Sequence, residues 1–162
     1  MVTLKRQICF AILTLGFPFS NMGYAEDPWI EDYHTAEALA VESAKALLLF
    51  FTGSDWCLWC RKLEREVLSE EALSTAISEV AIPLRIDFPQ RMKLPPKQRR
   101  SNAKLKDAWK VESIPSVILY DPISGKELWR HGYARLDAAD YAISIRKALN
   151  QSRGLDKDVV SQ

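Results

Sequence analysis

The chain reads Ala46-Leu47-Leu48-Leu49-Phe50-Phe51-Thr52-Gly53-Ser54-Asp55-Trp56-Cys57-Leu58-Trp59-Cys60 across the stretch that decides its fold. The first six residues are uninterrupted apolar side chains, a run that is typical of a central strand buried on both faces. The next four residues include Gly, Ser and Asp, which favour turns. We therefore predict a strand that ends near residue 51 and a helix that begins at the two cysteines.

The cysteine pair predicts thiol–disulfide exchange. Cys57 falls at the expected start of the helix, where backbone N–H groups and the helix dipole lower the pKa of a thiol. Cys60 lies one helical turn later, close enough to attack a mixed disulfide that forms at Cys57. We assign Cys57 as the nucleophile and Cys60 as the more buried resolving thiol, a redox pair that needs no metal and no organic cofactor.

Two other interpretations of the pair stay open, an inert structural disulfide and half of a zinc site. Zinc generally takes four protein ligands in a structural site. Beyond the N-terminal segment the chain adds only His34 and His131, which are remote from the cysteines in sequence. The sequence therefore favours a reactive pair over either alternative.

The first 25 residues have the three-part layout of a secretory signal peptide. Lys5 and Arg6 precede an apolar run over residues 7–19, and Gly23-Tyr24-Ala25 offers small residues for cleavage. A membrane-spanning helix needs about twenty apolar residues, so the run favours export with cleavage over the alternative, an uncleaved anchor. Cleavage removes Cys9 and leaves one close cysteine pair in a periplasmic protein. Such a pair indicates reactive cysteines rather than a structural disulfide.

Residues 26–150 are predicted to form one α/β domain, and residues 151–162 a flexible C-terminal tail. Strand patterns cover 46–51, 82–88, 116–120 and 126–132; helical patterns cover 30–45, 57–67, the stretch from 69, and 137–150. This order predicts a central mixed sheet of about four to five strands flanked by helices, with the first strands parallel and the last pair antiparallel. The formal charge of +1 gives no support to nucleic-acid binding.

The segment over residues 89–106 carries seven Lys and Arg side chains, three prolines and no acid. Pro95-Pro96 predicts an irregular first half, because proline blocks regular structure, and Ser101 is a candidate cap for a short helix that ends near Trp109. We interpret the segment as a solvated connector. Binding of an anionic partner is the alternative.

Three features in this order resemble the thioredoxin superfamily. Trp56-Cys57-Leu58-Trp59-Cys60 follows the central strand, Ile114-Pro115 precedes the next strand, and Gly132 lies after the last strand. The resemblance covers essentially all residues after the signal peptide. Within the superfamily, the stretch from Phe51 to Cys57 together with the basic, proline-bearing segment is most similar to the exported thioredoxin-like disulfide reductases. The implied fold is thioredoxin-like.

The resemblance implies a substrate groove beside the cysteines. Its expected lining is Trp56, Trp59, Ile114, Pro115, Gly132 and Tyr133. Pro115 is expected to follow a cis peptide bond, so that the backbone of Ile114 can pair with an extended substrate segment. Trp56 and Trp59 would supply an apolar docking platform, although a scaffold role for Trp56 is an equal alternative.

One position departs from the family pattern. Many thioredoxins have a buried carboxylate six residues before the first cysteine, where it helps to deprotonate the resolving thiol. This chain has Phe51 there, and Asp55 is the nearest acid to Cys57. Asp55 is therefore a possible proton-transfer residue, with a capping or loop role as the alternative.

The dipeptide Leu58-Trp59 bears on the direction of exchange. Strong oxidants of this fold carry a histidine between the cysteines, and here no such charge stabilises the thiolate. We expect a potential nearer about −270 mV than about −120 mV, unless Arg61 and Lys62 replace the missing charge. The prediction is a monomeric disulfide reductase. Its substrates would be exported proteins or small molecules with disulfides, and its electrons would come from a membrane donor of the DsbD type. A disulfide oxidase or isomerase and a non-redox chaperone module are the alternatives.

Overall fold

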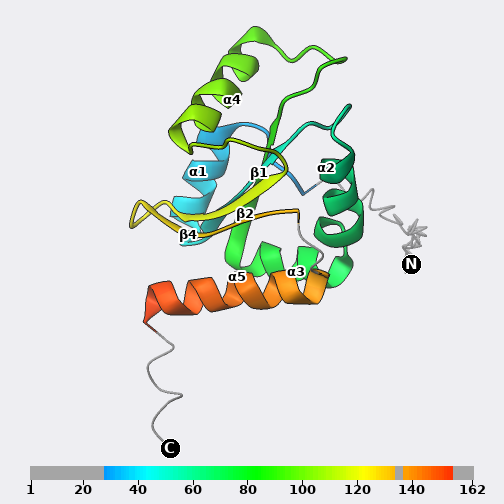
Figure 1. Cartoon of the computed structure of the whole chain (residues 1–162). Helices are drawn as coiled ribbons and strands as arrows, with labels where there is room; N and C mark the ends of the chain where they lie inside the picture. The colour runs from blue at the N-terminus through cyan, green and yellow to red at the C-terminus, as the bar shows by residue number, and fades with distance from the viewer. Residues whose placement is uncertain (1–27, 134–136, 155–162) are drawn as a thin grey trace, which may run out of the picture.

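The computed structural model describes residues 28–133 and 137–154, and its centre is a mixed sheet (Figure 1). The strands are β1 (Ala46–Thr52), β2 (Ala81–Asp87), β3 (Ser116–Asp121) and β4 (Lys126–Gly132), in the order β2-β1-β3-β4. β1 pairs with β2 in parallel, whereas β1 with β3 and β3 with β4 are antiparallel. The α/β class and the mixed four-stranded sheet are confirmed. The predicted signal peptide lies outside the described residues.

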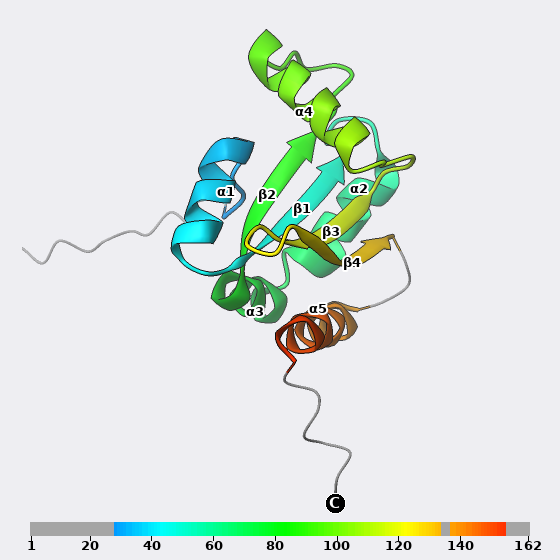
Figure 2. The same cartoon turned by 90° about the vertical axis from the view of Figure 1, so that its left-hand side faces the viewer.

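Helices cover both faces of the sheet (Figures 1 and 2). They are α1 (Tyr33–Glu42), α2 (Leu58–Leu63), the π-helix η1 (Glu64–Leu68), α3 (Glu71–Val80), α4 (Pro96–Ala108) and α5 (Ala138–Arg153). α2, η1, α3 and α5 bury apolar side chains with one face of β1, and α1 packs on the other face. No helix in the described ranges is long and apolar enough to cross a bilayer.

The apolar run before the cysteines forms β1, and all of its side chains are buried. Leu48 and Phe50 belong to the apolar cluster that includes both cysteines. Leu47 and Phe51 belong to the cluster on the opposite face, with Ala36 and Ala40 of α1. Because successive strand residues point to opposite faces, a continuous apolar run suits this doubly covered position. The position of β1 fixes the turn and the cysteines that follow it.

The last helix continues past the predicted end of the domain. α5 begins after Asp137, whose side chain accepts the backbone N–H of Asp140, and it runs to Arg153. Gly154 then adopts a left-handed conformation with φ 70°, which suits a helix C-terminus. The helix predicted to end near residue 150 therefore runs three residues further, because the polar residues after Leu149 complete its final turn. The rest of the predicted tail, residues 155–162, lies outside the described residues.

The basic segment is more regular than the sequence predicted. α4 has Pro96 in its first turn, where the missing N–H leaves no bond unmade. Pro95-Pro96 thus starts a 13-residue helix rather than preventing one, and Ser101 lies inside it. The buried Asn102 donates from Nδ2 to the carbonyl of Asp87 at 2.8 Å and fixes α4 to the end of β2.

Candidate active site

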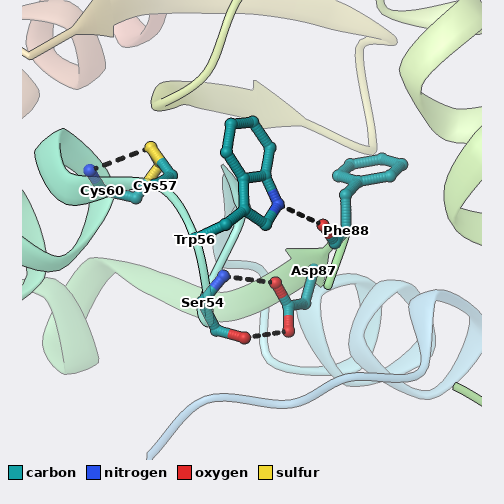
Figure 3. Close-up of a disulfide and its surroundings, with 6 residues drawn as sticks. All are labelled: Ser54, Trp56, Cys57, Cys60, Asp87 and Phe88. Atoms are coloured by element: carbon teal, nitrogen blue, oxygen red, sulfur yellow. Dashed lines mark hydrogen bonds between the residues drawn. A yellow bond between two sulfur atoms is a disulfide. The ribbon is translucent and has the colours of Figure 1, made fainter. Parts of the chain in front are cut away.

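Cys57 and Cys60 form a disulfide at the start of α2. Cys57 is the N-cap residue, and its Sγ accepts the backbone N–H of Cys60 at 3.2 Å (Figure 3). The side chain of Cys57 is 7% exposed, whereas that of Cys60 is fully buried. In the dithiol state the same N–H stabilises a thiolate at Cys57. The geometry therefore fits Cys57 as nucleophile and Cys60 as resolving thiol.

The turn between β1 and α2 depends on Gly53. Its carbonyl accepts the backbone N–H of Cys57 at 2.8 Å, which starts the helical turn. A Cβ atom on Gly53 would lie 2.6 Å from the indole of Trp56, a distance that real contacts do not reach. The glycine lets the indole fold back over the turn, and this places Trp56 directly beside the disulfide.

Asp87 anchors the same turn from β2. Its carboxylate accepts the backbone N–H of Ser54 at 2.9 Å and the Ser54 hydroxyl at 2.6 Å (Figure 3). The indole Nε1 of Trp56 donates to the carbonyl of Phe88 at 2.8 Å. Sequence reasoning missed Asp87 and Phe88. The only available signal was their place at the end of a strand, and that does not reveal which turn they contact.

Asp55 holds the segment that follows β2, which is the loop role given above as the alternative to proton transfer. Its carboxylate accepts the backbone N–H groups of Gln90, Arg91 and Met92, at 2.9, 2.7 and 2.9 Å. The hydrogen bond from Gln90 is the main cause that lowers the pKa of Asp55. A carboxylate with a lowered pKa is a weak base, so this geometry favours the loop role over proton transfer.

Replacement of Asp55 with alanine is expected to loosen residues 90–92 and to leave the rate of disulfide release unchanged. The three amides would lose their acceptor and exchange hydrogen faster. In the wild type the same protection should persist above pH 3.8 and fall as the pH drops through the lowered pKa of Asp55. Amide exchange by NMR and stopped-flow kinetics check both parts. Slower release in the variant would restore the proton-transfer role.

Of the other predicted groove residues, Ile114 and Pro115 lie immediately before β3, and Gly132 is the last residue of β4. The Ile114–Pro115 peptide bond is cis, and Ile114 contacts both apolar clusters. Ser116, which follows Pro115, is the first residue of β3 and pairs with Gly132 of β4. A Cβ atom on Gly132 would lie 3.3 Å from the carbonyl oxygen of Pro115. A glycine therefore permits the close approach of these two segments.

Trp59 and Tyr133 come together from α2 and from the end of β4. Their ring centroids are 4.8 Å apart, and the ammonium of Lys62 lies 5.6 and 5.7 Å from the two centroids. Trp59 is 52% exposed, and Trp56, which Figure 3 shows between Cys57 and Phe88, is 40% exposed. Both tryptophans thus present apolar surface near the disulfide, and Trp56 is also anchored to the scaffold.

A match to the thioredoxin-like family spans residues 28–122. The chain belongs to this family. It is 34% identical over 119 residues to the disulfide bond reductase DsbH of Chlamydia pneumoniae, a match that covers 74% of this chain and 71% of that protein.

Solved structures agree with the family. The structure of a DsbH oxidoreductase matches with a TM-score of 0.70 and 33% identity, over 75% of this chain and 83% of that one. The C-terminal domain of DsbD from Neisseria meningitidis in its reduced form matches with a TM-score of 0.53 and 17% identity, over 71% and 92%. The second likeness concerns the fold alone. The family, the DsbH relative and the cysteine pair identify a thiol–disulfide oxidoreductase.

Proposed function

We propose that the chain is an exported disulfide reductase of the periplasm. The Cys57 thiolate attacks one sulfur of a substrate disulfide, the substrate S–S bond breaks, and a mixed disulfide forms with release of one substrate thiolate. The Cys60 thiolate then attacks Cys57 Sγ and displaces the second substrate thiolate. The enzyme pair loses two electrons and becomes a disulfide, and the substrate gains two electrons and takes up protons to become a dithiol.

One observation carries this proposal. Cys57 Sγ lies at the helix start and accepts the N–H of Cys60, whose own sulfur is buried behind it. Of the two cysteines only Cys57 keeps any exposed surface, and the Cys60 sulfur is held where it can attack that of Cys57. An inert structural disulfide would require neither property.

Reduction is the direction that the surroundings of the pair favour. Leu58 and Trp59 place no charge between the cysteines. The Lys62 ammonium lies over the rings of Trp59 and Tyr133 and pairs with Glu66 at 3.9 Å. Little extra positive charge therefore stabilises the Cys57 thiolate. As a result the dithiol is a stronger reductant than that of a related enzyme with a charged residue between its cysteines. The relative named disulfide bond reductase supports the same direction.

A periplasmic reductase needs a source of electrons outside the cytosol. We assign this role to a membrane donor of the DsbD type, which would reduce the Cys57–Cys60 disulfide after each cycle. Exported proteins with disulfides are the substrates in this scheme. The DsbH relative supports a place in such a pathway.

The redox potential tests the direction. Equilibrium of the purified protein with glutathione should give a value near about −270 mV. With dithiothreitol present to reduce the Cys57–Cys60 disulfide again, the protein should reduce insulin with turnover. The variant Trp59→His serves as a control, because a charge between the cysteines should stabilise the thiolate and raise the potential by at least about 30 mV. A wild-type potential above about −200 mV would make oxidation the better description.

A further inference from the structure

A hollow lies beside Trp56, between the segment that follows β2 and helix α4. Its volume is about 380 Å³, which is within the range of about 300 to 1,000 Å³ for sites that hold small ligands. The residues that matter for its chemistry are Phe88, Met92, Lys93, Leu94, Arg99 and Asn102. We call this site the α4 hollow. α4 lies at the end of the sheet opposite to α5 (Figures 1 and 2).

The α4 hollow adjoins the turn that carries the cysteines. Phe88, in its wall, accepts the indole N–H of Trp56, the residue before Cys57 (Figure 3). The carboxylate of Asp55, two residues before Cys57, binds the backbone of residues 90–92. A polypeptide whose disulfide reaches Cys57 therefore has its flanking residues next to this hollow.

Hydrogen bonds hold the hollow in shape before any partner arrives. Asn102 Nδ2 donates to the carbonyl of Asp87, and Ser54 occupies both oxygens of the Asp87 carboxylate. Asp55 fixes the opposite wall through three backbone amides. A preformed site avoids much of the entropy cost of ordering a loop on binding.

The chemistry of the lining combines apolar surface with positive charge. Met92 is 59% exposed, and Phe88 and Leu94 add apolar groups beside it. Lys93 and Arg99 supply two cations, and no acidic residue occurs between residues 88 and 106. The acidic group in the lining is Asp87, which is buried and directs both carboxylate oxygens to Ser54. The complement of this surface is an apolar side chain next to a carboxylate.

We infer that the α4 hollow binds an apolar–acidic stretch of substrate polypeptide close to the target cysteine. This inference rests on the proposed function and names the substrate class of the same site. The apolar side chain packs on Met92 and Phe88, and the carboxylate meets Lys93 and Arg99. The remaining cations of α4 raise the rate at which acidic partners arrive, since charge complementarity acts mainly on association.

Activated peptides test the inference. Each peptide carries one cysteine as a mixed disulfide with 2-thiopyridine. Each also carries one pair of residues, either Leu-Glu, Leu-Lys or Ser-Glu, placed two, three or four positions from that cysteine. Stopped-flow release of thiopyridone by the reduced protein should be about 3- to 10-fold faster for Leu-Glu than for either alternative, as expected for one or two exposed ion pairs and a partly buried side chain. The preference for Glu over Lys should shrink in high salt.

Variants assign the effect to the hollow. The double variant Lys93→Glu, Arg99→Glu should reverse the preference between Leu-Glu and Leu-Lys, and Met92→Ser should remove the preference between Leu-Glu and Ser-Glu. Lys147→Glu, an exposed charge on α5 at the other end of the molecule, is the matched control and should change neither.

Other outcomes separate this inference from the proposed function. Dithiodipyridine without a peptide reports the reactivity of Cys57 alone, and no reaction with it would overturn the proposed function. A normal reaction with equal rates for all peptides would overturn the docking site only. If the charge variants instead lose binding to phosphatidylglycerol vesicles while the peptide rates stay equal, the cations serve a lipid surface and the inference is wrong.

Discussion

Replacement of Cys60 with serine is expected to preserve the first half of the exchange and to abolish the second. Cys57 keeps its place at the helix start, so it still attacks a substrate disulfide. The mixed disulfide then persists, because the thiol that would resolve it is gone. A well-placed intramolecular group acts with an effective molarity that can reach about 10⁵ to 10⁸ M. An external thiol at millimolar concentration therefore cannot replace Cys60. Turnover should fall by at least about a thousandfold.

The matched control is Cys57→Ser. Cys60 is fully buried behind Cys57, so this variant should form no mixed disulfide and should also lose turnover. Non-reducing gels and intact mass measure the covalent product, and insulin reduction measures turnover. Trapped adducts in Cys60→Ser also identify the substrates. Equal trapping by both variants would contradict the assigned roles. If Cys57→Ser instead kept full partner binding and the wild-type phenotype, the result would favour a non-redox chaperone module.

Local sequence predicted the strand and the helix that carry the cysteines. A continuous apolar run can be satisfied only where both faces of a strand are covered, and β1 has that position. The turn residues after it and the cysteine spacing then placed the sulfurs at a helix start. The remaining groove came from family resemblance alone, since neither a cis bond at Pro115 nor the approach of Gly132 can be read from a single sequence.

The polar supports of the site could not be predicted. Asp55 binds amides more than thirty residues away, and Asp87 binds Ser54 across the parallel pair of strands. Such contacts depend on strand register, which the sequence pattern does not specify between β1 and β2. α4 was misjudged for a different reason. A proline pair marks both interruptions and helix starts. The choice between them depends on tertiary contacts, such as that of Asn102 in α4 with Asp87, which the local sequence does not reveal.

Tyr141 is a further support that the sequence did not reveal. This residue of α5 is fully buried, and its hydroxyl donates to the carbonyl of Gly132 at 2.7 Å. Its ring makes edge contacts with Trp129 and His131 of β4, at centroid distances of 5.4 and 5.6 Å. Burial raises the pKa of Tyr141, so the hydroxyl remains a donor throughout the neutral range. Tyr141 thus connects α5 to the strand end that leads into the groove.

Replacement of Tyr141 with alanine is expected to lower the free energy of unfolding by about 3 to 5 kcal/mol, as for other buried aromatic residues cut back to alanine. Tyr141→Phe keeps the ring and removes only the hydrogen bond, so it should cost about 1 kcal/mol. Urea titration of the oxidised protein measures both. Because Gly132 precedes Tyr133, the alanine variant should also loosen the Trp59–Tyr133 contact and change the fluorescence of the tryptophans. A loss of equal size in the two variants would show that the hydrogen bond, rather than packing, holds α5 against β4.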